Sequence, residues 1–466
     1  MLFSSIPFLY RFLPLVLLLY YAAPRRLKNT VLLLASLFFY AWGEPKFLVF
    51  MLFSVAQAYV CGRLLGTLKR RGGRRVVLCV SLVLSLGLLG FCKYADFFIQ
   101  SFRTLTGLSL PLLHIALPVG ISFYTFQVLS YVVDVYRGDV PPQKNPIDFA
   151  MYIAMFPQLI AGPIVRYRDI EPMLRVREHS VALCAAGGRR FLVGLSKKVI
   201  LADSLAALST AAFGASEQSV MSAWLGAVFF TLQIYFDFSG YSDMAIGLGK
   251  LFGFSFSENF NYPYLAASIT EFWRRWHISL SAWFRDYLYI PLGGNRVPRW
   301  RWLLNLVIVW GATGLWHGAA WNFILWGLYF AVLLIAEKLF LLRGLKKLRV
   351  LNHVYVLLAV IFGFVLFDAN GAAEGFAKLG ALFGGGGLPL WNTESFYVLR
   401  DGAVLLLVGA VGATPLCAHL FSRLVKTRCG ARVGFLLQCV GSAALLTVCT
   451  AYLVSGSYSP FLYFRF

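Results

Sequence analysis

The chain has 466 residues, of which 59% are hydrophobic, 17% aromatic and only 13% charged, and its mean hydropathy is +0.72. Soluble globular proteins average about 25% charged residues, so a chain of this composition cannot cover a water-facing surface and needs lipid as its solvent. The net charge of +22 falls in short clusters between apolar runs, which argues against nucleic-acid binding and is typical of cytoplasmic loops beside anionic lipid headgroups. These clusters lie at 25–28, 69–75, 343–349 and 423–432.

The first predicted element is a helix over the apolar run 6–22. Its positive charges, Arg25 and Arg26, follow the run instead of preceding it, and no clean small-residue cleavage site appears. We therefore expect a retained first helix that starts outside and ends in the cytoplasm, which places the chain in an inner or plasma membrane.

Apolar runs recur to the end of the chain, although several are too short to cross a bilayer alone. We predict an all-α integral membrane protein with about 10–12 transmembrane helices plus re-entrant or interfacial helices. The longest polar stretches are only about thirty residues, so residues 1–466 are predicted to form a single polytopic membrane domain. The runs lie at 6–22, 30–42, 46–61, 76–92, 111–135, 147–160, 190–212, 220–236, 301–316, 321–342, 351–367, 402–422 and 433–455.

Two regions depart from simple lipid-facing helices. Residues 162–180 are rich in arginine and acid, and residues 259–301 are dense in aromatic and charged side chains and interrupted by proline and glycine. Broken or charged backbone near a membrane survives only where it is buried in protein or lines a wet cavity. The second region is therefore predicted to form the floor or wall of an internal site.

The chain lacks the usual signatures of several enzyme classes. Its eight cysteines form no C-x-x-C pair, so we expect small buried hydrophobes, with neither a disulfide framework nor a metal site. The phosphate-binding loop, the H-E-x-x-H zinc motif and the G-x-S-x-G serine elbow are missing from the sequence. Imidazole in a low-dielectric site remains, and its pKa of about 6.5 suits it to take a proton from a hydroxyl and return it.

His317 lies between two long apolar runs, in the segment 310–321. An ionisable residue at such depth marks a functional site by default, and the alternative is a neutral histidine that bonds one helix to another. Gly314 and Gly318 favour the functional interpretation, because they remove side chains beside the imidazole and let a substrate or another backbone approach. His317 is therefore the candidate catalytic residue.

His277 lies in the segment 270–285, where helical spacing places Trp273 on the same face. The alternative for this segment is an interfacial amphipathic helix with an aromatic belt and snorkelling arginines. We take His277 as the candidate partner of His317. The other histidines lie near segment ends or in polar loops and receive no role: His114, His179, His353 and His419.

Asp237 and Asp243 lie beside an apolar run, and buried carboxylates need hydrogen bonds or cations. Three interpretations stay open: they orient a histidine, pair with arginine, or lock helices together. The candidate substrate- or tunnel-lining residues are Tyr235, Asp237, Asp243, Trp273, Ser281 and Trp316.

Several segments resemble the membrane-bound O-acyltransferases (MBOAT), and especially the bacterial branch that contains alginate and peptidoglycan O-acetyltransferases. The resemblance runs in order over essentially the whole chain. It is carried by 117–127 (LPVGISFYTFQ), 156–163 (FPQLIAGP), 235–243 (YFDFSGYSD), 259–263 (NFNYP), 272–281 (FWRRWHISLS), 314–319 (GLWHGA) and the two ends, 1–5 and 460–466.

The resemblance implies a ring of helices around a central tunnel in a bacterial inner membrane. His317 matches the histidine regarded as catalytic, and His277 matches a second site that is asparagine in many eukaryotic members. The implied donor is acetyl-CoA or another cytosolic acyl thioester, used as a substrate, with no bound cofactor and no metal. We expect basic residues at the cytoplasmic mouth to hold donor phosphates, although positive-inside bias also places arginines there. These residues are Arg166, Arg168, Arg274 and Arg275.

By hypothesis, His317 is the general base for an acceptor hydroxyl that attacks the thioester, and His277 orients that hydroxyl or stabilises the oxyanion. Asp237 or Asp243 fixes an imidazole tautomer, and a two-step route through an acyl-enzyme stays open. Acetyl transfer is favoured over D-alanyl transfer to teichoic acid, because residues 236–243 and 461–466 resemble the acetylating branch. That branch works with an extracytoplasmic partner of hydrolase-like fold, so the polysaccharide acceptor is reached indirectly.

A polysaccharide or lipid transporter is the alternative class, since broken segments with intramembrane histidine and aspartate are transporter features too. It predicts inverted repeats, and neither the Trp-Arg-Arg-Trp-His nor the Leu-Trp-His-Gly pattern has a second copy. A structural scaffold gives no reason for His317 beside two glycines. The acceptor stays open among alginate, peptidoglycan, cellulose, other exopolysaccharides and teichoic acids, and so does the length of the acyl group.

Overall fold

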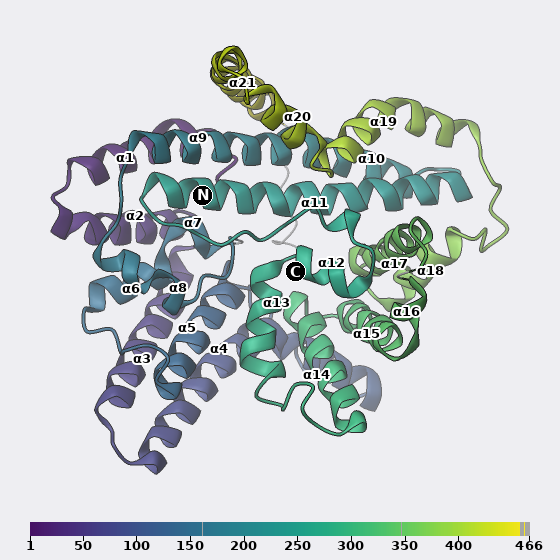
Figure 1. Ribbon diagram of the computed structural model, residues 1–466. Coiled ribbons are helices and arrows are strands. Elements are labelled where there is room, and N and C mark those ends of the chain that lie inside the picture. The colour runs from purple at the N-terminus through teal and green to yellow at the C-terminus, as the bar shows by residue number, and fades with distance from the viewer. Residues whose placement is uncertain (161, 346, 457–460, 462–466) are drawn as a thin grey trace. The chain divides into compact units, whose positions relative to one another are not determined.

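The described part of the chain folds into helices and contains no strand (Figure 1). The computed structural model describes residues 1–160, 162–345, 347–456 and 461. The closing segment 460–466, which carries part of the family resemblance, lies outside the described residues except for Phe461. The prediction of an all-α protein is confirmed.

The chain divides into two compact units. The first comprises residues 1–191 and 244–257, and the second comprises residues 192–243 and 258–466. Two helices continue from one unit into the other, α9 (Val181–Ser196) and α11 (Val220–Leu251).

The first unit is built around three long helices that lie side by side, α3, α4 and α5 (Figure 1). Helix α5 is buried along most of its length, including the polar side chains of Gln127, Ser130 and Asp134. The other helices of this unit are shorter than these three. The helices are α1 (Leu13–Ala22), α2 (Lys28–Gly43), α3 (Leu48–Thr67), α4 (Arg71–Thr106), α5 (Ile121–Arg137), α6 (Pro146–Ala154), α7 (Phe156–Leu159) and α8 (Tyr167–Arg175).

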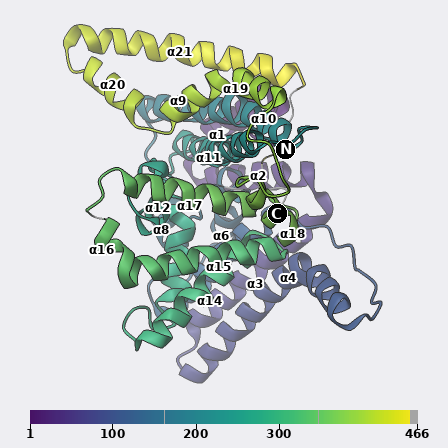
Figure 2. The same cartoon turned by 90° about the vertical axis from the view of Figure 1, so that its right-hand side faces the viewer.

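The second unit contains both candidate histidines. Figure 2 shows α14, α15 and α17 as successive neighbours, and α14 packs against α15, which in turn packs against α17. The helices are α10 (Asp203–Phe213), α12 (Ile269–Arg275), α13 (Ile278–Phe284), α14 (Arg299–His317), α15 (Trp321–Ala336), α16 (Leu342–Leu345), α17 (Leu351–Asp368), α18 (Ala372–Ala381), α19 (Thr393–Gly412), α20 (Leu416–Leu424) and α21 (Arg428–Val454).

Seven helices within the described residues are long and apolar enough to cross a bilayer, which makes this an integral, multi-pass membrane protein. The expected count of about 10–12 also included apolar runs that fold as shorter pieces. The run 147–160 is broken at Met155, ahead of Pro157, and the run 111–135 is helical only from Ile121 onward. The seven spans are Pro45–Thr67, Arg71–Thr106, Val220–Leu251, Trp321–Leu345, Leu351–Asp368, Thr393–Gly412 and Cys429–Val454.

Candidate active site

His317 is the last residue of α14. The helix ends there because Gly318 has extended backbone angles, φ −164° and ψ 154°, and the chain then enters α15. The imidazole is buried and is surrounded by aromatic rings, with centroid distances of 5.0 Å to Trp316, 4.9 Å to Trp326 and 5.3 Å to Phe367. The titratable ring therefore lies in an apolar environment.

The glycines beside His317 permit a close approach between α14 and α15. A Cβ atom at Gly314 would lie 2.3 Å from the carbonyl oxygen of Phe323, and one at Gly318 would lie 2.1 Å from the Phe323 ring. Real Cβ atoms essentially never come within 3.0 Å of another heavy atom. The sequence left open whether a substrate or another backbone lies against these glycines. In the structure, residue Phe323 of the neighbouring helix α15 lies there.

His277 separates α12 from α13 and adopts a left-handed backbone, φ 45° and ψ 54°. This conformation is uncommon for residues other than glycine, and such outliers cluster at functional sites. The side chain is 1% exposed and packs against Phe238, with ring centroids 4.6 Å apart. Burial lowers the pKa of His277 to about 3, so the imidazole is neutral at physiological pH.

Trp316 connects the two histidines. Its ring contacts that of His317 at 5.0 Å and that of His277 at 6.0 Å, both in edge-to-face geometry. Three residues from the predicted set thus lie together in the second unit, contributed by α14 and by the segment between α12 and α13.

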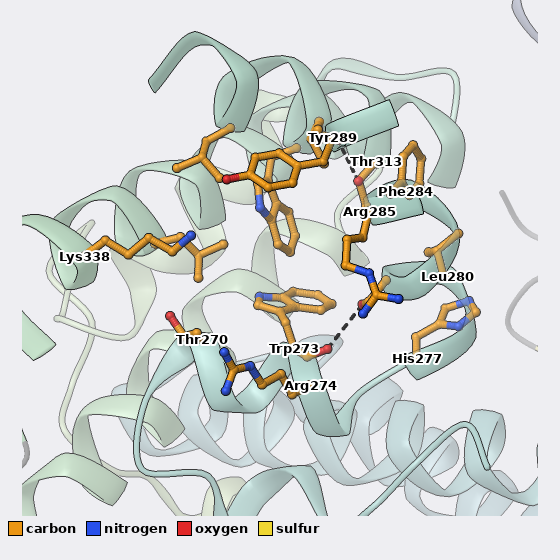
Figure 3. Close-up of a pocket in the computed structure, with 15 residues that line it drawn as sticks. Thr270, Trp273, Arg274, His277, Leu280, Phe284, Arg285, Tyr289, Thr313 and Lys338 are labelled. Atoms are coloured by element: carbon orange, nitrogen blue, oxygen red, sulfur yellow. Dashed lines mark hydrogen bonds between the residues drawn. The ribbon is translucent and has the colours of Figure 1, made fainter. Parts of the chain in front are cut away.

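A cavity of about 220 Å³ adjoins this region within the second unit (Figure 3). Its lining includes the predicted residues His277, Trp273, Ser281 and Arg274, but not His317. Figure 3 shows the His277 imidazole projecting from the edge of the cavity away from Trp273. The Trp326 ring contacts both Trp273, at 5.6 Å, and His317, at 4.9 Å, so one aromatic ring links the cavity wall to the candidate catalytic residue.

The predicted phosphate-binding arginines have different surroundings. Arg274 is exposed, lines the cavity together with Lys338, and makes no ion pair within the part of the chain that the structure describes. Its neighbour Arg275 pairs with Glu271 at 2.6 Å. Arg166 and Arg168 belong to the other unit, where both approach Asp169, at 2.9 and 3.9 Å.

The two acids on α11 are held by two consecutive lysines. Lys198 Nζ lies 2.7 Å from Asp237 and 2.7 Å from Asp203, and Lys197 Nζ lies 2.7 Å from Asp243. The lysines belong to a π-helical turn, Lys197–Ala202, between α9 and α10. These contacts match the helix-locking interpretation, with lysine in place of the arginine considered from the sequence.

The remaining predicted lining residue, Tyr235, is buried in an aromatic cluster and contacts Tyr264 and Trp276, with centroids 5.3 and 6.4 Å apart. Among the other histidines, His353 Nδ1 lies 3.1 Å from the Ala266 carbonyl oxygen, and His179 Nε2 lies 2.9 Å from Tyr20 Oη. No group of three metal-ligating side chains occurs among the described residues.

Sequence reasoning missed two residues that position the site. Asn259 contacts the His277 imidazole, with Nδ1 and Oδ1 3.2 Å apart. Glu337, which is fully buried, accepts hydrogen bonds from the backbone nitrogens of Ile269 and Thr270 at 2.5 and 2.9 Å, and so holds the start of α12. An acid inside the apolar run 321–342 was an available signal for Glu337. Asn259 begins the segment 259–263 that resembles the family, but nothing in the sequence pointed to its contact with His277.

Comparison with known proteins identifies the family. The family model described as MBOAT, membrane-bound O-acyltransferase family, matches residues 142–372, which include both histidines and the cavity. A probable alginate O-acetylase AlgI of Azotobacter vinelandii is 40% identical, with all of both chains aligned. A peptidoglycan O-acetyltransferase of Helicobacter pylori is 32% identical over 100% of this chain and 98% of its own.

A more distant relative is a teichoic acid D-alanyltransferase of Bacillus subtilis, which is 29% identical over 54% of this chain and 69% of its own. The similarity to the first two proteins extends over the full length, and the family match covers the segment in which two imidazoles share a tryptophan. This chain therefore belongs to the membrane-bound O-acyltransferase family and is an O-acyltransferase.

Proposed function

We propose that this protein is an O-acetyltransferase of the bacterial inner membrane that moves acetyl groups toward the hydroxyls of an extracytoplasmic polysaccharide. The observation that carries the proposal is the pair of buried imidazoles, His277 and His317, that both contact the Trp316 ring. Two O-acetylating relatives align with the whole chain, whereas the D-alanylating relative aligns with about half of it. An alginate-like polyuronate is the first acceptor to test.

In the proposed reaction an imidazole nitrogen of His317 takes the proton of an acceptor hydroxyl. The hydroxyl oxygen forms a bond to the thioester carbonyl carbon, the carbon–sulfur bond breaks, and the proton passes to the departing thiolate. The aromatic rings around His317 exclude water, which favours transfer over hydrolysis of the thioester.

The donor in this proposal is a cytosolic acyl thioester such as acetyl-CoA, held by the cavity lined by Trp273. Arg274 and Lys338 are exposed cations on that lining, as suits binding of phosphate groups. A cavity of about 220 Å³ is smaller than the roughly 300–1,000 Å³ of drug-sized ligand sites, so it accommodates only one end of such a donor.

The proposal also includes a separate extracytoplasmic protein of hydrolase-like fold that completes transfer to the sugar. Such a partner is implied by the resemblance to the acetylating branch. It accounts for how a membrane enzyme reaches a polymer that lies outside the bilayer.

The test of the proposed function is transfer of labelled acetyl from acetyl-CoA by the full-length protein in detergent, with alginate oligosaccharide and the extracytoplasmic fraction of the source cells. We expect His317→Gln to abolish transfer, a loss of roughly 100-fold or more for a general base. The exposed His419 gives the matched control, and His419→Gln should keep the wild-type rate. Wild-type transfer by folded His317→Gln protein would refute the proposal.

The donor site is tested by a pair of adjacent arginines. Arg274→Gln should raise KM for acetyl-CoA by roughly tenfold or more, because hydrogen bonds between charged groups contribute about 1.5–3 kcal/mol. Arg275→Gln should leave KM near the wild-type value, since Arg275 is engaged by Glu271. Equal KM values in the two variants would exclude Arg274 from donor binding.

A further inference from the structure

Two backbone hydrogen bonds join residues 259–261 to the junction between α12 and α13 and place Asn259 beside His277. The carbonyl oxygen of Asn259 accepts a hydrogen bond from the backbone nitrogen of Ile278 at 3.0 Å, and the backbone nitrogen of Asn261 donates to the carbonyl of Arg275 at 2.9 Å. These two hydrogen bonds fix the backbone of Asn259 next to His277, whose own backbone is left-handed.

The orientation of the Asn259 amide follows from its other partners. Its Oδ1 accepts from the Ser279 backbone nitrogen at 3.2 Å and from Ser279 Oγ at 2.9 Å, and its Nδ2 donates to Ser242 Oγ at 3.2 Å. A backbone N–H is only a donor, so the atom facing it is the amide oxygen. That same oxygen lies 3.2 Å from His277 Nδ1.

Because an amide oxygen only accepts, His277 Nδ1 must carry the hydrogen of this contact. In a neutral imidazole the other nitrogen, Nε2, then has a lone pair and no proton. His277 Nε2 is buried and has no hydrogen-bond partner among the described residues. It is therefore the nitrogen of this ring that is left to accept a further hydrogen bond.

We propose that Asn259 is a positioning residue that fixes His277 in the Nδ1–H tautomer and so presents Nε2 as a hydrogen-bond acceptor. This rests on the proposed function and decides between two roles open for His277. An unprotonated Nε2 holds a group that carries a hydrogen, such as the acceptor hydroxyl, and it has no hydrogen to give to an oxyanion. His277 therefore orients the acceptor hydroxyl.

The charged and titratable groups on the elements packed around His277 do not contact its nitrogens in any described hydrogen bond. On α11, Asp237 and Asp243 pair with Lys198 and Lys197. On α14, His317 contacts Trp316. On the flanking helical turns, Glu271 pairs with Arg275, and Arg285 pairs with Asp286. Arg274 lies on the same turns and lines the cavity. The tautomer is thus set by a neutral amide.

The experiment is nitrogen-15 NMR of the full-length protein in detergent with labelled histidine, in which the His277 signals are assigned through His277→Asn. The ring-nitrogen shifts report which nitrogen carries the proton. We expect wild-type His277 to show a protonated Nδ1 and a bare Nε2, and Asn259→Leu to lose this preference. A wild-type His277 with its proton on Nε2 overturns the proposal whether or not any variant folds.

Asn259→Asp distinguishes positioning from general stability. A carboxylate beside Nδ1 stabilises the imidazolium, so the acidic limb of the transfer rate should move to higher pH. The rate of Asn259→Leu should fall roughly tenfold or more, with KM for acetyl-CoA near wild type. The control is Asn305→Asp, a buried asparagine that donates to the Leu292 and Gly294 carbonyls, which should leave the His277 shifts and the pH profile unchanged.

The outcomes separate the two proposals. If the wild type transfers no acetyl group, the proposed function fails while the shifts still report the tautomer. If Asn259→Leu changes the tautomer but keeps the wild-type rate, acetyl transfer is retained and the positioning role of Asn259 is overturned. An unchanged tautomer in folded Asn259→Leu also overturns it.

Discussion

Gly314→Ala tests whether the close approach of α14 and α15 positions the catalytic histidine. The added methyl would lie 2.3 Å from the Phe323 carbonyl oxygen, so the helices must separate by about 0.7 Å to reach the 3.0 Å lower limit for such contacts. His317 ends the same helix three residues later and moves with it. Overpacking of this kind costs about 1–3 kcal/mol, and a 1 Å displacement of a catalytic group costs up to about 100-fold in rate.

We therefore expect Gly314→Ala to lower the acetyl-transfer rate by roughly 10- to 100-fold and to lower the melting temperature in detergent. Gly311→Ala is the matched control, because it adds the same methyl one turn earlier on α14, where nothing lies within 4 Å. It should keep the rate and gain up to about 1 kcal/mol of helix stability. Equal rates and melting temperatures for the two variants would refute the positioning role of this helix contact.

Two further predictions concern buried charge. Lys198→Met should destabilise the protein by about 3–5 kcal/mol in thermal unfolding, because it removes the cation between the buried Asp237 and the partly buried Asp203. Lys197 is more exposed, so Lys197→Met should cost less, and equal losses in the two variants would contradict this reasoning. The pKa of His277 is about 3 in the folded protein, below the unfolded value of about 6.5. Between these two pH values the imidazole is protonated only in the unfolded chain, so the free energy of unfolding falls as the pH drops from about 6.5 toward 3. The loss is about 2 kcal/mol near pH 5, and His277→Asn should remove that part of the slope in melting temperature; an unchanged slope would argue that His277 is not buried neutral.

Composition was sufficient to predict an all-α membrane protein, since apolar runs of this length have few other structures available. The number of spanning helices was harder to predict. The run 147–160 breaks at Met155, ahead of Pro157, and 111–120 is not helical; proline or glycine interrupts both segments, and tertiary contacts also constrain the backbone. Gly120, for example, has φ +76° and sits directly against the Leu159 carbonyl.

The candidate site was partly predictable for a similar reason. Histidines in apolar sequence are conspicuous, and the structure places His277 and His317 around one tryptophan. The lysine partners of Asp237 and Asp243 were not predicted, because Lys197 and Lys198 lie inside the separate apolar run 190–212 and nothing in the sequence connects that run to α11. Asn259 was missed because its role depends on a backbone pairing with residues 275–278.

The left-handed backbone at residue 277 limits which side chains that position accepts. Glycine and asparagine adopt φ 45° readily, whereas most other residues there pay a steric penalty of about 1–2 kcal/mol. An alanine at this position would therefore combine backbone strain with the missing imidazole, and its phenotype would be ambiguous. Asparagine removes the imidazole without this backbone strain, so His277→Asn is the better experimental variant. For the same reason, asparagine is the side chain that evolution can place here with the least cost to the fold.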